Sequence, residues 1–250
     1  MTPASRWQLS GDRLDLLAPG CHHVGMHHRT WLNRVTYDLS RVAVRVLGGC
    51  FCRFRFTGGQ NIPAATGGLF CSNHQSYLDP VLLGAACDRR LNYLAREELF
   101  QSRFLGSLIR WYDAIPIQRD GLGIGGLKET LKRLKRGELV LIFPEGTRTT
   151  DGQVQELKAG FCVLARRAQV PIIPVGLEGP YEAWPRQQKL PRPARLAVSI
   201  GPPIWPDQFA QLSDEQLRQL LAERIKDCHQ AARQLCGKVG KIPRVTRTGR

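Results

Sequence analysis

An apolar run of strand length passes directly into a polar cluster in the stretch Gly68-Leu69-Phe70-Cys71-Ser72-Asn73-His74-Gln75-Ser76-Tyr77-Leu78-Asp79. The same design returns about seventy residues later, where Glu138-Leu139-Val140-Leu141-Ile142 leads into Phe143-Pro144-Glu145-Gly146-Thr147-Arg148. An open α/β sheet binds its ligands at the carboxyl ends of its strands. We therefore expect the two polar clusters to face one crevice.

The spacing of His74 and Asp79 restricts where each residue can lie. On a regular helix five residues turn about 500°, so the two side chains would point about 140° apart. The pair can meet only if His74 lies on the turn before a helix. Asp79-Pro80 favours this, because Asp is a preferred N-cap and Pro suits the first helical position, so we expect a helix from Pro80 to Cys87. The alternative is that Asp79 is only an N-cap and His74 only a turn residue.

An Asp at this position stays ionised beside the positive end of the helix dipole. It can hold one imidazole nitrogen and leave the other free as a base, as Asp does in hydrolase triads. Glycine-x-serine-x-glycine, the nucleophile elbow of many hydrolases, does not occur in the sequence.

These residues resemble the glycerolipid acyltransferases of the lysophosphatidic acid acyltransferase type. Asn73, His74 and Asp79 match the first block of that family, Asn-His-x4-Asp, and Phe143 to Arg148 match the third block in full. Residues 114–119, which end in Arg119, resemble the second block more loosely, and Val170 to Gly176 resemble the fourth. The resemblance covers roughly residues 50 to 205.

The resemblance implies a role for each matched residue. His74 would take the proton from the acceptor hydroxyl, which a neutral imidazole can do near pH 7, and Asp79 would orient it. The remaining matched residues would bind substrate: Asn73, Arg119, Glu145, Gly146, Thr147 and Arg148. Arg119 and Arg148 would hold a phosphate, because guanidinium pairs bidentately with phosphate oxygens, although both could instead form surface ion pairs. Lys158 could add charge to the same phosphate or be a solvated lysine.

The implied reaction is transfer of a fatty acyl group from acyl-CoA or acyl carrier protein to the 2-hydroxyl of 1-acyl-glycerol 3-phosphate, giving phosphatidic acid. No metal or organic cofactor is implied. Alternative acceptors are another lyso-lipid, such as a lyso-ornithine lipid, or glycerol 3-phosphate, and a hydrolase would use the His–Asp pair with water. A basic nucleic-acid-binding protein is a further alternative, but it would leave both motifs without a role, so no nucleic acid is expected as a partner.

The composition agrees with an anionic partner. The chain has 250 residues and a net charge of +15, with an isoelectric point of about 10.0. Such a balance suits a phospholipid surface or a phosphorylated substrate. The sequence has no run of 18 apolar residues, so we expect no transmembrane helix, and we expect no signal peptide. The eight cysteines are scattered, which suggests reduced thiols. We expect a peripheral protein on the cytoplasmic face of a membrane.

Four segments are expected along the chain. Residues 1–28 would be a flexible lead, in which Cys21-His22-His23 and His27-His28 are taken as adventitious rather than as a metal site. Residues 29–49 would be an amphipathic helix in the membrane interface, 50–236 the acyltransferase domain and 237–250 a basic disordered tail.

The expected interfacial helix has an apolar stripe bordered by arginines. Its apolar residues recur at helical spacing: Trp31, Val35, Leu39, Val42 and Val46. Arg34, Arg41 and Arg45 would lie on anionic head groups. The alternative is that the stripe packs on the protein's own core.

The remaining pattern alternates strands with helices. Strands are expected at 51–56, 91–95, 171–175 and 194–200, and helices at 97–111, 121–136, 158–168 and 214–236, the last opened by the capping box Ser213-Asp214-Glu215-Gln216. Residues 180–193 would be a loop. Such alternation indicates an α/β fold with a mainly parallel central sheet flanked by helices.

Overall fold

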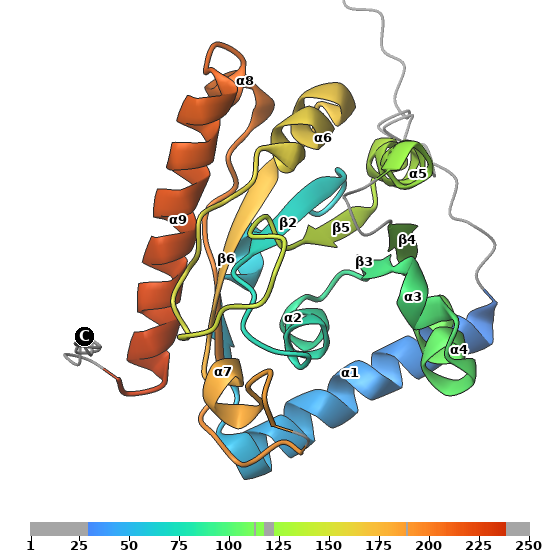
Figure 1. Cartoon of the computed structure of the whole chain (residues 1–250), viewed down its shortest axis with the longest axis vertical. Coiled ribbons are helices and arrows are strands. Elements are labelled where there is room, and N and C mark those ends of the chain that lie inside the picture. Colours follow the sequence, from blue (N-terminus) through green and yellow to red (C-terminus); the bar gives the residue numbers. More distant parts are fainter. Residues whose placement is uncertain (1–29, 113, 118–122, 189, 239–250) are drawn as a thin grey trace, which may run out of the picture.

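A seven-stranded sheet forms the centre of the computed structural model, which describes residues 30–112, 114–117, 123–188 and 190–238 (Figure 1). The strand order is β1-β7-β6-β2-β5-β3-β4. The strands are β1 (Arg55–Thr57), β2 (Gly68–Ser72), β3 (Leu91–Arg96), β4 (Ile115–Ile117), β5 (Leu139–Ile142), β6 (Ile172–Glu178) and β7 (Ala197–Ile200). β6 and β7 are antiparallel, and every other neighbouring pair is parallel. The expected mainly parallel α/β fold is confirmed.

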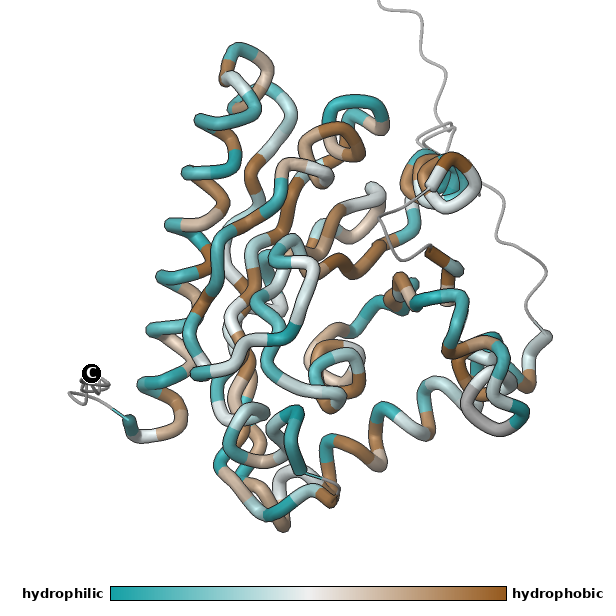
Figure 2. The backbone as a smooth tube through the Cα atoms, in the orientation of Figure 1, coloured by the Kyte–Doolittle hydropathy of each residue, from teal (hydrophilic) through white to brown (hydrophobic). Residues whose placement is uncertain are grey.

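The central strands are buried on both faces, which is why they read as continuous apolar runs. All five residues of β2 are buried. Because side chains alternate along a strand, Leu69 and Cys71 join one hydrophobic cluster and Phe70 joins the other. Figure 2 shows hydrophobic residues along the central strands and hydrophilic residues along the outer turns of α9 (Asp214–Leu235).

Helices cover both faces of the sheet. α5 (Gly123–Lys135), α6 (Gly160–Ala168) and α9 pack on one face, and α2 (Asp79–Ala86) packs on the other. The expected capping box at Ser213 and Gln216 opens α9. α9 lies so close to β6 that a Cβ at Gly176 would be 2.1 Å from the backbone nitrogen of His229, so this contact requires glycine. Short elements complete the fold: η1 (Gly59–Asn61), α3 (Glu97–Phe100), α4 (Arg103–Trp111), α7 (Pro180–Ala183) and α8 (Pro206–Phe209).

α1 (Trp31–Cys52) lies across the outer side of α2 (Figure 1). The expected apolar stripe is exposed, with Trp31 74% and Leu39 63% accessible, so it does not pack on the core. Two of the three arginines differ from expectation, because they hold the helix on the protein. Arg41 donates to the carbonyl of Asp88 over 2.6 Å. Arg45 donates to the carbonyl of Ala85 and to the Asp88 carboxylate, each over 2.7 Å.

Several expected boundaries need correction. The helix expected to end at residue 49 continues to Cys52, and the strand expected at 51–56 is only Arg55–Thr57. The helix ends because Arg53 adopts a left-handed conformation with a φ of 48°, which lets the Phe54 amide donate to Gly48. The expected loop at 180–193 contains α7. Residues 1–28 and most of the expected tail lie outside the described part of the chain, within which no helix is long and apolar enough to cross a membrane.

Candidate active site

His74 and Asp79 form a hydrogen-bonded pair on the turn between β2 and α2. The imidazole Nδ1 and the Asp79 Oδ2 are 2.7 Å apart. The same oxygen accepts the backbone amides of Gln75 and Ser76 over 2.5 and 2.8 Å. Because the carboxylate takes up Nδ1, Nε2 is the imidazole nitrogen left to act on a ligand. The structure therefore brings together the two residues that the five-residue spacing predicts to meet.

The structure corrects the capping role expected for Asp79. Asp79 is itself the first helical residue, Leu78 precedes it at the cap position, and the carboxylate accepts amides of the preceding turn. The carboxyl group is fully buried. Burial raises the pKa of Asp79 above its ordinary value of 3.8, and the hydrogen bonds from His74 and the two amides offset part of that rise. The turn is thus built around the carboxylate, which holds the imidazole in one orientation.

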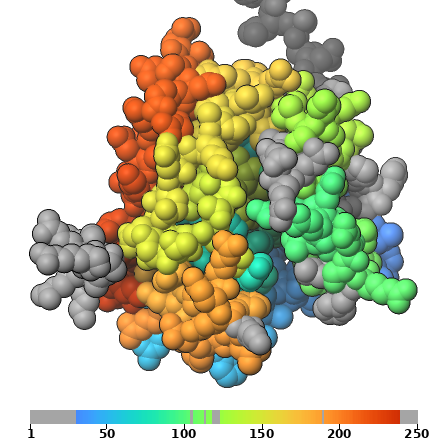
Figure 3. All heavy atoms as spheres, viewed as in Figure 1, coloured from blue at the N-terminus to red at the C-terminus, as the bar shows by residue number. Residues whose placement is uncertain are grey.

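The loop after β5 lies directly against this turn. β2 and β5 are neighbours in register, with Cys71 opposite Ile142. The Phe143 ring stacks on the imidazole of His74, with centroids 3.9 Å apart and planes 13° apart. The Thr149 amide donates to the His74 carbonyl over 2.8 Å. The two polar clusters therefore meet at the carboxyl ends of the neighbouring strands β2 and β5, as the sequence predicts. In Figure 3 the teal atoms of the β2–α2 turn are recessed beside the yellow-green loop.

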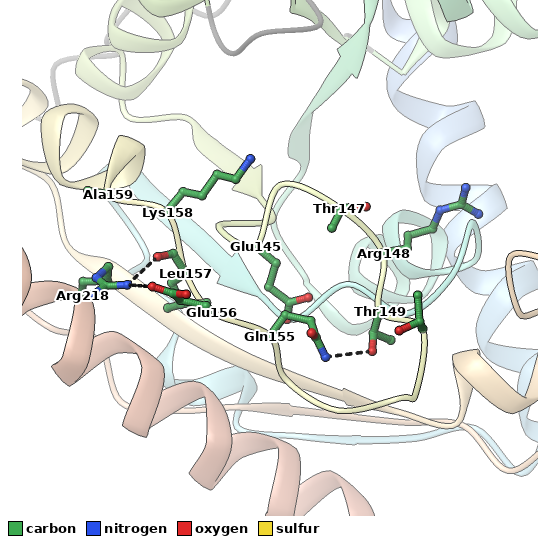
Figure 4. Close-up of a pocket in the computed structure, with 11 residues that line it drawn as sticks. Glu145, Thr147, Arg148, Thr149, Gln155, Glu156, Leu157, Lys158, Ala159 and Arg218 are labelled. Carbon is green, nitrogen blue, oxygen red and sulfur yellow. Dashed lines mark hydrogen bonds and ion pairs between the residues drawn. The ribbon is translucent and has the colours of Figure 1, made fainter. Parts of the chain in front are cut away.

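A cleft of about 720 Å³ opens along this loop (Figure 4). It is lined by Glu145, Thr147, Arg148, Thr149, Thr150, Gln155, Glu156, Leu157, Lys158, Ala159 and Arg218. Gly146 has a φ of 73°, a left-handed conformation that favours glycine, and the Lys158 side chain lies over it. Figure 4 shows Lys158 and Arg148 on opposite sides of Glu145. Arg218 is already bound to Glu156 over 2.5 Å.

Glu145 is a buried carboxyl group at the base of the cleft. Only 3% of the residue is exposed, and neither carboxylate oxygen has a hydrogen-bond partner among the described residues. Burial raises the pKa of Glu145 to about 8, and the nearby charge of Asp79 adds to that rise, although the backbone of Gln155 and His74 opposes it. A carboxyl group in this state is mainly protonated at neutral pH and has its hydrogen-bonding capacity free for a ligand.

Arg148 is the cationic residue of the third block. Its guanidinium lies over the Tyr77 ring, with Cζ 3.7 Å from the ring centroid. Its Nη1 is buried and has no hydrogen-bond partner in the described part of the chain. Thr147, beside it, is exposed on the cleft wall. Among the described residues, this cation has no carboxylate partner.

One predicted substrate-binding residue is not part of this cleft, and another lies outside the described residues. Asn73 is buried, and its side-chain amide donates to and accepts from the backbone of Leu177 over 3.0 and 2.7 Å, so it joins β2 to β6 behind the site. Arg119 lies outside the described residues. Sequence reasoning did not assign a role to Tyr77 or Gln75. Gln75 joins the turn to the next loop through the Gly152 carbonyl over 3.0 Å. Apart from their position inside the motif, nothing in the sequence marks either residue.

Comparison with known proteins identifies the family. Residues 53–178 match the sequence pattern of the family described as acyltransferase. A 1-acyl-sn-glycerol-3-phosphate acyltransferase of Bacillus subtilis is 30% identical over 181 residues, which cover 70% of this chain and 88% of that protein. This chain belongs to the acyltransferase family. Its motif residues therefore sit in the fold of an enzyme that transfers acyl groups.

Other relatives of this acyltransferase differ in length. The chloroplast 1-acyl-sn-glycerol-3-phosphate acyltransferase BAT2 of Brassica napus is 28% identical over 179 residues, and the match spans 52% of it. The solved structure of the 1-acyl-sn-glycerophosphate acyltransferase PlsC from Thermotoga maritima superposes with a TM-score of 0.71 at 25% identity, covering 86% of each chain. Both motif turns lie within residues 53–178, the part of the chain that matches the family.

Proposed function

We propose that this acyltransferase moves a fatty acyl group from a thioester donor to the 2-hydroxyl of 1-acyl-glycerol 3-phosphate, giving phosphatidic acid. The relatives named above carry out acylation of 1-acyl-glycerol 3-phosphate according to their names. The observation that supports the proposal most directly is that the His74–Asp79 pair lies near Arg148, which has no carboxylate partner among the residues that the structure describes. A base and a phosphate-binding cation at one cleft suit an acceptor that carries both a hydroxyl and a phosphate.

In the proposed reaction His74 acts as the general base. Nε2 takes the proton of the acceptor hydroxyl while its oxygen attacks the thioester carbonyl carbon, forming a tetrahedral intermediate. The intermediate collapses by breaking the carbon–sulfur bond. The imidazolium then returns the proton to the departing thiolate, so the products are the ester and the free thiol. Asp79 stabilises the imidazolium and holds the ring, and no covalent acyl-enzyme is formed.

The acceptor would be held by its phosphate and its glycerol backbone. Arg148 would bind the phosphate with the free edge of its guanidinium, and Arg119 would join it on the strength of the sequence resemblance alone. The Glu145 carboxyl group, with Gly146 and Thr147 at the same turn, would contact the glycerol oxygens. Lys158 lies on the other side of Glu145 and would attract the anionic donor or acceptor to the cleft. The chemistry proposed here uses no metal ion or organic cofactor.

The partners proposed are acyl-CoA or acyl carrier protein, a lyso-phospholipid and an anionic membrane surface. The exposed stripe of α1 supports the last of these. Its accessible apolar residues are Trp31, Leu32, Val35, Leu39, Val42, Val46, Leu47 and Phe51. A row of exposed apolar side chains beside polar ones suits the interface between water and lipid. With Arg41 and Arg45 engaged on α2, Arg34 is the exposed arginine left to meet head groups. We propose peripheral attachment at the cytoplasmic face.

A product assay tests the proposed reaction. Purified protein should be given labelled acyl-CoA or acyl carrier protein together with 1-acyl-glycerol 3-phosphate, a lyso-ornithine lipid or glycerol 3-phosphate, and the products analysed by mass spectrometry. Phosphatidic acid should be the main labelled product. If another acceptor is preferred, that acceptor is the substrate and the assignment of 1-acyl-glycerol 3-phosphate is wrong. Free fatty acid as the main product in every mixture would indicate hydrolysis instead of transfer.

A further inference from the structure

Tyr77 is an exposed aromatic residue at the centre of the catalytic turn. It lies between His74 and Asp79 in sequence, yet it takes no part in their hydrogen bonds. Its exposed fraction is 57%, and its ring face has a cationic partner. That partner is Arg148, from the loop after β5, whose guanidinium carbon lies 3.7 Å from the ring centroid. A cation at this distance over a ring face is attracted by the ring's quadrupole.

The stacking leaves the guanidinium edge free. The ring covers one face of the planar group, whereas its N–H donors point outward in the plane. Within the described part of the chain, Arg148 has no carboxylate partner, and its buried Nη1 has no acceptor. The other buried or half-buried arginines described above, such as Arg45 and Arg218, donate to carboxylates or carbonyls. The face of the Arg148 guanidinium therefore rests on Tyr77, whereas Nη1 on its edge has no hydrogen-bond acceptor among the described residues.

Neighbouring contacts hold the Tyr77 ring in place. The ring packs against Trp184, with centroids 5.8 Å apart and planes inclined by 58°. The Ser76 hydroxyl donates to the Trp184 carbonyl over 2.8 Å. The indole of Trp184 donates to the Gln188 carbonyl over 3.0 Å. The ring is thus supported on one side by the segment around α7, and it supports Arg148 on the other.

We propose that Tyr77 is a positioning residue that holds the Arg148 guanidinium by its face so that its edge meets the acceptor phosphate. This inference rests on the proposed function, because the phosphate is that of the lyso-phospholipid. The turn between β2 and α2 would then have two roles. His74 and Asp79 would deprotonate the acceptor hydroxyl, and Tyr77 would set the distance between His74 and the acceptor phosphate. A displaced guanidinium would bind the phosphate more weakly without changing the His–Asp pair.

Kinetics with three variants test the proposal. Tyr77→Leu removes the ring face and should raise the acceptor KM roughly 3- to 30-fold, the range that corresponds to a cation–π contact at a partly desolvated site. The donor KM should stay within a factor of about two. Tyr77→Phe keeps the ring face and should restore the acceptor KM to near the wild-type value. Trp205→Leu removes an exposed aromatic residue at the start of α8 and is the matched control.

A double-variant cycle asks whether Tyr77 acts through Arg148. In an Arg148→Ala background, Tyr77→Leu should raise the acceptor KM no further, because the group that it positions has been removed. If Tyr77→Leu has the same effect in both backgrounds, or no larger an effect than Trp205→Leu, the proposal is wrong. Failure of Tyr77→Phe to restore the KM would also overturn it, since the hydroxyl rather than the ring face would then matter.

A binding measurement separates this inference from the proposed function. Glycerol 3-phosphate serves as a soluble phosphate probe, and the Arg148 Nε–H resonance, assigned by its loss in Arg148→Lys, reports its binding. In wild type the Tyr77 ring should shift this resonance upfield, and a hydrogen bond to the probe phosphate should shift it downfield. The probe concentration that is needed for this second shift should be higher in Tyr77→Leu. If these shifts are seen but no phosphatidic acid is formed, the proposed function is wrong, whereas the positioning of Arg148 by Tyr77 is supported. If phosphatidic acid is formed but Tyr77→Leu leaves the Arg148 resonance unchanged, the proposed function is supported and the positioning role of Tyr77 is wrong.

Discussion

The imidazole of His74 and the ring of Phe143 lie face to face, with centroids 3.9 Å apart. His74 is the second residue of the loop after β2 and Phe143 is the first residue of the loop after β5, so the contact joins the two motifs near the ends of their strands. Together with the hydrogen bond to Asp79, it leaves the imidazole little freedom to rotate. A base held in this way does not have to be ordered when the substrate arrives.

Removal of the base should abolish most of the turnover. His74→Ala should lower kcat by about 10²–10⁴, the range typical of general-base catalysis. Asp79→Asn should also lose activity, and it should lose stability because three donors converge on the Asp79 oxygen. Steady-state kinetics, with circular dichroism as the check on folding, would measure both. Near wild-type turnover in folded His74→Ala would contradict the mechanism.

Loss of the stacked ring should affect turnover more than binding. Phe143→Leu removes an aromatic contact worth about 0.5–1.5 kcal/mol, so kcat should fall up to roughly tenfold while the acceptor KM changes little. Phe161→Leu is the control, because it shortens a buried phenylalanine of α6 in the hydrophobic core. If both variants lower kcat equally, the effect of Phe143 is one of general stability and not of imidazole orientation.

Glu145 should make the stability of the protein depend on pH. Burial raises the pKa of this carboxyl group from 4.5 to about 8. The folded protein therefore binds the proton more tightly than the unfolded chain, and the stabilisation is fully present below pH 4.5 and is lost as the pH rises towards 8. Urea unfolding should show the free energy of unfolding falling over this range, by an amount of the order of a few kcal/mol.

The matched variant for this dependence is Glu145→Gln, which keeps the shape and cannot ionise. Its unfolding free energy should fall less than that of wild type between pH 5 and 8, a window that follows from the two pKa values. Comparing the difference between the two proteins at each pH cancels the contribution of other groups. Parallel curves would show that Glu145 is already ionised at neutral pH.

Arg148 should act on the acceptor and not on the donor. Arg148→Ala loses a charge-assisted contact worth roughly 1.5–3 kcal/mol, which corresponds to about a ten- to hundredfold rise in acceptor KM. Arg148→Lys should recover only part of this, because an ammonium group cannot grip two oxygens in a fixed fork or stack flat on Tyr77. Separate titration of acceptor and donor gives the two values, and a change in the donor KM alone would assign Arg148 to the donor.

Substitutions on the exposed face of α1 and at its half-buried Arg45 should change different measured properties. Leu39→Gln with Val46→Gln should weaken flotation with anionic liposomes and leave the Tm unchanged, because both side chains are exposed. Arg45→Ala should lower the Tm, because it removes the contacts to Ala85 and Asp88. Arg34→Ala should weaken liposome binding by about 1 kcal/mol at low salt. Unchanged flotation of the double glutamine variant would place the membrane contact on another surface.

The sequence predicts the site where local rules suffice. The ends of β2 and β5 could be assigned because buried parallel strands read as apolar runs, and His74 and Asp79 had to meet because only a turn allows their spacing. The Tyr77–Arg148 contact was not predictable in this way, because it joins residues about seventy positions apart whose approach depends on the completed sheet.

The N-terminal helix shows the same limit. The apolar stripe of α1 follows from its periodicity, and its exposure agrees with the expected surface helix. The direction of Arg41 and Arg45 does not follow, because it depends on the position of the α2 carboxyl end beneath them. Periodicity places arginines on one border of the helix, but it does not say whether that border faces solvent or another helix.

The pairing of β1 with β7 has a consequence for how the chain is made. Arg55 lies opposite Ala197, so two strands separated by about 140 residues are neighbours at one edge of the sheet. Pairing at such a distance in sequence forms slowly. While the ribosome is still adding residues, β1 has no partner and β6 has an open edge towards the missing β7. An open edge can pair with other chains, so prematurely terminated products should aggregate, and completion of the sheet waits on the last strand to be synthesised.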